Sequence, residues 1–105
     1  MPESNGKYEK MRLEMGREYY RDLTGSQRLV LLYMYLKTNK VLKPSYYAGL
    51  VGLSRPAIYY QIRLLSGVGV TIVQAKHGKW TLAEYLDRFE EYDAIMEREM
   101  GNIPI

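Results

Sequence analysis

The sequence predicts one mainly helical domain that carries a small β-hairpin. Apolar residues recur at spacings of three and four in several stretches, which is the period of a helix with one buried face. A single β-branched run, followed by a turn with glycine and a second short run, is typical of a hairpin. At 105 residues the chain is long enough for one domain and too short for two ordinary ones. We therefore assign residues 7–105 to one domain.

The N-terminal part is expected to be a short disordered segment, called the lead below, followed by an amphipathic helix. Residues 1–6 have the composition of a disordered lead, and residues 7–22 that of the helix. Balanced charges in this helix alternate with an apolar face at spacings of three and four residues. That face consists of Tyr8, Met11, Met15 and Tyr19.

The core helix is expected from about Ser26 to Thr38. Thr24 and Gln27 before it have the spacing of a capping box, in which side chain and backbone bond reciprocally. The helix is apolar around most of its circumference, so we expect most of it to be covered. It opens the predicted core of the domain, residues 24–82.

Two more helices follow, separated by a tight turn. Pro44 fits the first turn of a short helix over about 44–51. Gly52 suits the left-handed conformation that ends a helix tightly. Ser54 is then a natural N-cap for a helix over 55–66. The buried stripe of this last helix is expected to be Ile58, Ile62 and Leu65.

A hairpin and a terminal helix complete the order. Residues 70–74 and 79–81 are predicted strands, joined by a turn over 75–78. Thr81 and Glu84 have the spacing of a second capping box, so a helix is expected over 82–100.

The segment after the tight turn resembles the recognition region of winged-helix transcription regulators of the MarR and PadR types. Those proteins place a glycine, an aliphatic residue, a serine and an arginine before and at the start of this helix, as Gly52, Leu53, Ser54 and Arg55 stand here. Ile58-Tyr59 and Gly69-Val70 match the next parts of the pattern. The resemblance covers residues 26–82 and extends to small archaeal plasmid and virus proteins. It implies a winged helix-turn-helix with additional N- and C-terminal helices.

The charge distribution supports a polyanionic partner. Between Thr24 and Leu82 the chain has no aspartate or glutamate but eight lysines and arginines, whereas the residues after Leu82 are acidic. An uncompensated positive field favours nucleic acid. We therefore expect a sequence-specific regulator that binds double-stranded DNA and represses transcription.

The resemblance places helix 55–66 in the major groove and the wing, residues 74–80, at the minor groove or flanking phosphates. Arg55 and Arg63 can contact a guanine edge or a phosphate. One of the two tyrosines, Tyr59 or Tyr60, could instead pack against a neighbouring helix, and the wing could be no more than a solvated turn. The expected DNA contacts are Lys43, Ser54, Arg55, Pro56, Ala57, Tyr59, Tyr60, Arg63, Lys76, His77 and Lys79.

The terminal helices, residues 7–22 and 82–100, are expected to join two chains into a homodimer. The acidic face of the last helix would then point away from the DNA, which would be pseudo-palindromic. Alternatively, both helices fold back onto their own domain. The expected interface residues are Tyr8, Met11, Met15, Tyr19, Tyr85, Phe89, Tyr92 and Met96.

The composition argues against catalysis. The chain has one histidine, His77, and no cysteine, and its carboxylates all lie before Thr24 or after Leu82. We expect no enzyme activity, no cofactor and no metal. We also expect no signal peptide and no membrane span, hence a cytoplasmic, nucleoid-associated protein. Two other functions stay open: an architectural or plasmid-partition protein, with a possible partner protein, and a winged helix that binds only protein.

Overall fold

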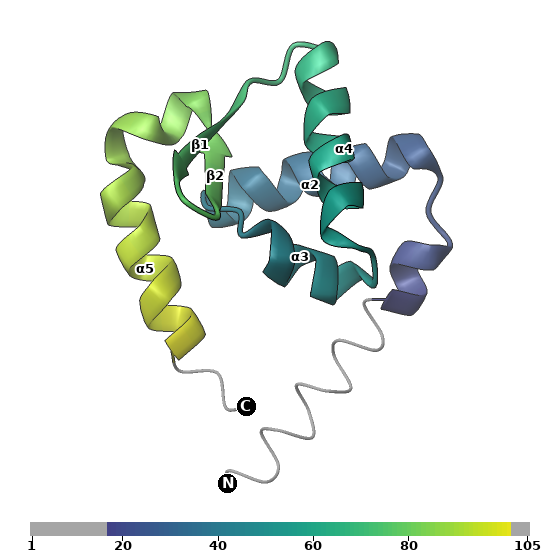
Figure 1. The fold of residues 1–105 in the computed structure, drawn as a ribbon, viewed down its shortest axis with the longest axis horizontal. Helices are drawn as coiled ribbons and strands as arrows, with labels where there is room; N and C mark the ends of the chain where they lie inside the picture. The colour runs from purple at the N-terminus through teal and green to yellow at the C-terminus, as the bar shows by residue number, and fades with distance from the viewer. Residues whose placement is uncertain (1–16, 102–105) are drawn as a thin grey trace, which may run out of the picture.

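The computed structural model describes residues 17–101, which form a mainly helical fold with one two-stranded antiparallel sheet (Figure 1). A short helical segment at residues 17–21 comes first. The expected lead and residues 7–16 of the first helix lie outside the described range. The elements that follow are α2 (Gly25–Asn39), α3 (Pro44–Val51), α4 (Arg55–Gly67), β1 (Ile72–Lys76), β2 (Lys79–Leu82), η1 (Ala83–Arg88) and α5 (Phe89–Gly101).

The capping box predicted for α2 is confirmed. The Thr24 hydroxyl accepts a hydrogen bond from the Gln27 amide at 3.2 Å, and the Thr24 amide donates to the Gln27 side chain at 2.9 Å. However, α2 is covered on one side only, since Val30 and Met34 are more than half exposed. The expectation that most of its circumference is covered was wrong, because the C-terminal helix packs beside the hairpin and leaves this face open.

The prediction for α3 and α4 is confirmed almost to the residue. Gly52 adopts φ 78°, and its amide donates to the carbonyl of Ala48 at 2.8 Å, which ends α3. The Ser54 hydroxyl caps α4 by accepting from the Ala57 amide at 3.4 Å. The stripe of Ile58, Ile62 and Leu65 is buried.

The hairpin begins two residues later than predicted and turns through His77 and Gly78 alone. Gly78 adopts φ 76°, the left-handed conformation that glycine enters without a steric penalty. Leu42, between α2 and α3, pairs with Trp80 of β2 through two backbone hydrogen bonds of 2.7 and 2.8 Å. This bridge, which we had not predicted, attaches the start of α3 to the hairpin.

The single helix expected over 82–100 is in fact two elements, the 3₁₀ helix η1 and then α5. The second capping box is also absent. The Thr81 hydroxyl is buried and donates to the carbonyl of Lys40 at 2.6 Å, while Glu84 pairs with Lys37 at 3.0 Å. Both side chains thus make long-range contacts in place of the local cap, and local spacing could not indicate such contacts.

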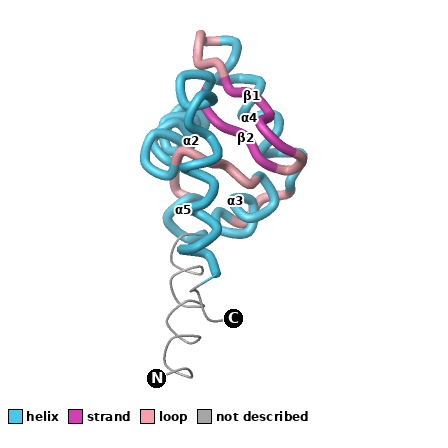
Figure 2. Tube along the Cα trace, turned by 90° about the vertical axis from the view of Figure 1, so that its left-hand side faces the viewer, coloured by secondary structure: helices cyan, strands magenta, loops and turns pink. Residues whose placement is uncertain are grey.

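Two apolar clusters hold the fold together. The main core lies between α2, α3, α4 and the hairpin, and it includes Tyr20 from the N-terminal segment. The buried amide of Gln61 in α4 donates to the Tyr20 hydroxyl. A smaller cluster of Val41, Phe89 and Met96 holds α5. Figure 1 shows α4 and α5 on opposite sides of the hairpin, and the side view in Figure 2 shows α5 beside the strands.

Candidate nucleic-acid interface

The outer face of α4 is exposed, cationic and free of acidic neighbours in sequence. Arg55, Pro56, Tyr60 and Arg63 are exposed, opposite the buried stripe. Neither arginine makes an ion pair with any residue between 17 and 101. No acidic residue occupies the first turn of α4, so the partial positive charge of the helix N-terminus is uncompensated there. This face can accept an anion.

The two adjacent tyrosines of α4 have different surroundings. Tyr59 is half-buried, and its ring meets that of Trp80 edge to face, with centroids 5.8 Å apart. Tyr60 is 57% exposed. One tyrosine therefore packs, as the alternative interpretation held, but against β2 rather than a helix. Tyr59 and the half-buried Ala57 hold α4 in place, while Tyr60 stays on the outer face.

Arg17 is a cation at the α3–α4 turn that sequence reasoning missed. Its Nε donates to the carbonyl of Gly49 at 3.0 Å. Its side chain also crosses Gly52 so closely that a Cβ there would lie 3.1 Å from the Arg17 Cγ. The contact joins residues 32 positions apart, so no local pattern in the charge-balanced N-terminal segment signals it.

The lysines expected to contact DNA are not free. All three, Lys43, Lys76 and Lys79, form a cluster beside α5, which we call the lysine cluster. The ammonium of Lys79 lies 2.7 Å from Asp93 and 2.9 Å from Glu97. Its neighbours are paired as well: Lys43 with Glu97 at 2.5 Å, and Lys76 with Glu90 at 3.1 Å and Asp93 at 3.5 Å.

The acidic face of the last helix, which was expected to point away from the DNA, lies against the lysine cluster. Glu90, Asp93 and Glu97 recur at spacings of three and four, so they share one face of α5. That face is turned towards the hairpin, because burying Phe89 and Met96 against Val41 fixes the rotation of the helix. Of the three residues expected to contact DNA from the hairpin, Lys76, His77 and Lys79, only His77 is both exposed and outside the lysine cluster.

The ion pairs hold these groups in their charged forms. Hydrogen bonds from Lys43 and Lys79 lower the pKa of Glu97 to about 2. The hydrogen bond to Glu90 raises the pKa of Lys76. Burial by itself lowers the pKa of Lys79, but its hydrogen bonds to Asp93 and Glu97 outweigh burial, so the net shift is upward. The network therefore persists at neutral pH.

Much of the interface that we expected between two chains is buried within a single chain. Phe89 and Met96 are only 4% and 7% exposed, buried in the smaller cluster of their own chain. The half-buried rings of Tyr85 and Tyr92 meet edge to face at 5.6 Å. The C-terminal helix thus has the folded-back arrangement that we had given as the alternative. Tyr19 is exposed, and Tyr8, Met11 and Met15 lie outside the described range.

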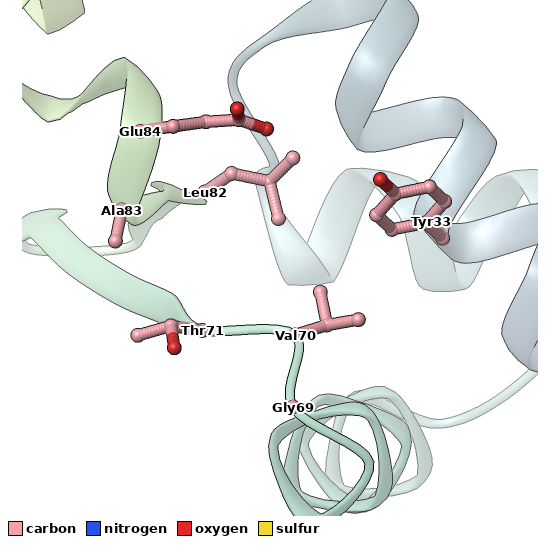
Figure 3. Close-up of a pocket in the computed structure, with 7 residues that line it drawn as sticks. All are labelled: Tyr33, Gly69, Val70, Thr71, Leu82, Ala83 and Glu84. Carbon is pink, nitrogen blue, oxygen red and sulfur yellow. The ribbon is translucent and has the colours of Figure 1, made fainter.

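The described part of the chain has little that suggests a metal or cofactor site. Residues 17–101 contain no group of three or more histidine, cysteine or acidic side chains that could hold a metal ion. A pocket of about 300 Å³ lies between α2, the loop before β1 and η1, with Tyr33, Val70 and Leu82 around it (Figure 3). Its one carboxylate, Glu84, is already paired with Lys37.

No helix within residues 17–101 has the length and apolar character that crossing a membrane requires.

No protein-family model matches the chain, and no curated protein or solved structure matches it either. The functional interpretation therefore rests on the geometry and charge of the described residues.

Proposed function

We propose that this chain is a winged helix-turn-helix protein that binds double-stranded DNA through the outer face of α4 and represses transcription. One observation carries the proposal: Arg55 and Arg63 are exposed and without an acidic partner in the described range, on a helix whose opposite face is buried. The proposed action is occupation of a DNA site, with no catalysis and no cofactor.

The spacing of the two arginines suits a groove. They are eight residues apart, which is about 12 Å along a helix axis and close to the width of the major groove. Arg55 stands in the first turn, the part of a recognition helix that reaches base edges. Arg63 lies two turns later, where a backbone phosphate can be reached, and the exposed Tyr60 lies between the two arginines along the helix.

The order of elements supports the winged form. The tight turn joins α3 to α4, the hairpin follows, and Tyr59 packs on Trp80 to set the two side by side. The Leu42–Trp80 bridge then ties the hairpin to the start of α3. A rigid attachment of this kind lets a hairpin and a helix present one combined surface to a duplex.

A homodimer on a pseudo-palindromic site remains part of the proposal. Of the interface residues expected within the described range, Tyr19 is the most exposed. It lines a groove of about 310 Å³ with Val30 and Met34 of α2, and none of the described residues that line this groove is charged. Two positively charged copies can meet across such a surface without like-charge contacts.

Binding should be tested on DNA selected from random fragments, with fluorescence anisotropy on the selected and a scrambled duplex. Arg55→Ala is expected to reduce discrimination between them by about 1–3 kcal/mol. Arg98→Ala, which removes an exposed arginine from α5, is the control for net charge. If the two variants discriminate equally between the selected and the scrambled duplex, Arg55 does not contact the bases that distinguish them. If the wild-type protein does not bind DNA at low salt, the proposal is wrong. A footprint that spreads with protein concentration would favour the architectural role.

A further inference from the structure

We propose that the acidic face of α5 is an internal competitor for DNA phosphates, occupying the lysine cluster until a duplex displaces it. This inference rests on the proposed function, because it needs a polyanion that binds next to the hairpin. It assigns a role to three carboxylates, Glu90, Asp93 and Glu97, that the proposed function leaves unused.

The carboxylates stand where phosphates would be bound. Lys43 precedes α3, while Lys76 and Lys79 flank the hairpin turn, so three separate points of the chain converge on one side of α5. Every ammonium in the cluster has a carboxylate oxygen within 3.1 Å. Three carboxylates face three ammonium groups, so the formal charge of the contact is zero. Without α5 it would be +3.

The contact has the character of a displaceable one. The side chains of Glu90 and Glu97 are 77% and 49% exposed, and exposed ion pairs are weak and screened by salt. Among the described residues of the main core, none comes from α5. The helix is held by the small cluster around Phe89 and by the buried Asp93. It can therefore leave while α2, α3, α4 and the hairpin stay packed.

Displacement would convert a neutral surface into part of the binding site. Each freed lysine can neutralise a phosphate and release a counterion. Each such contact steepens the fall of the logarithm of the binding constant with the logarithm of salt concentration by about 0.9. A duplex docked on Arg55 and Arg63 would bring phosphates towards the hairpin, since Tyr59 and Trp80 hold α4 against β2. The chain would then bind in two stages, α4 first and the hairpin after α5 leaves.

The test compares two double variants of the full chain with the same change in net charge. Glu90→Gln with Glu97→Gln removes carboxylates from the lysine cluster. Asp87→Asn with Glu99→Gln removes two exposed carboxylates that pair with no described residue. Binding to one duplex is measured by anisotropy over a range of salt concentrations, and circular dichroism checks that both variants fold.

The first variant is expected to bind more tightly than the second, because the duplex no longer has to displace the carboxylates of Glu90 and Glu97 from the lysine cluster. Equal affinities would overturn the inference, because general charge would then explain the change. If wild type and both variants all ignore DNA at low salt, the proposed function itself fails, and the inference fails with it.

A second measurement uses unmodified protein. On addition of saturating duplex, amide hydrogen exchange in α5 is expected to accelerate, while the amides of Leu32 and Leu36 in the α2 core keep their protection. Unchanged or increased protection of α5 in the complex would show that the helix stays docked, and would overturn the inference even if the variants bind DNA as expected.

Discussion

Replacing Phe89 by alanine tests how α5 is held. The side chain is 4% exposed, packs with Val41 and Met96, and places its ring 5.8 Å from the ammonium of Lys76. Truncating a buried phenylalanine costs about 3–5 kcal/mol. Since the cluster is small and lies at the edge of the fold, we expect the lower end, about 3 kcal/mol, including about 0.5 kcal/mol for the contact with Lys76.

The loss is measured by urea unfolding followed by circular dichroism at two protein concentrations that differ widely. Because the contacts of Phe89 lie within one chain, the fall in unfolding free energy should be the same at both. Ile95→Ala is the matched control, since this residue is on the same helix and 43% exposed. It should lose less than about 1 kcal/mol. A loss for Phe89→Ala that changes with protein concentration would place Phe89 between chains and refute the reasoning.

Two further predictions concern the turn and the ion pairs. Gly52→Ala should lower stability by about 1–2 kcal/mol in thermal unfolding, because φ is 78° and Arg17 is close, whereas Gly67→Ala, with open space, should not. The pKa of Glu97 falls from 4.5 to about 2 on folding, so its contribution is complete above pH 4.5 and disappears as the pH falls towards 2. The protection of α5 amides against hydrogen exchange should therefore fall as the pH is lowered from 4.5 towards 2. In the Glu97→Gln variant this protection should depend less on pH.

Local signals explain why α3 and α4 were predicted so closely. Pro44, Gly52 and Ser54 fix where these helices start and end, and each acts through its own backbone or that of near neighbours. The buried stripe of α4 followed from helical period alone. None of this needed knowledge of distant contacts.

The errors arose where distant contacts decide the structure. Where one helix was expected, η1 precedes α5, and η1 has contacts far along the chain, such as that of the Tyr85 ring with the Lys40 ammonium, 4.4 Å from its centroid. Counting charge by segment showed a basic centre and an acidic end, but it could not show that the two meet. The different roles of Tyr59 and Tyr60 likewise depend on where the hairpin docks.

The hydrogen bond between Gln61 and Tyr20 has a consequence for the order of folding. It joins residues 41 positions apart, and closing so long a loop is entropically costly and slow. During synthesis, Tyr20 leaves the ribosome well before α4 has been translated, so its ring has no completed site to enter. The earliest-made part of the described chain is therefore expected to reach its final position among the last.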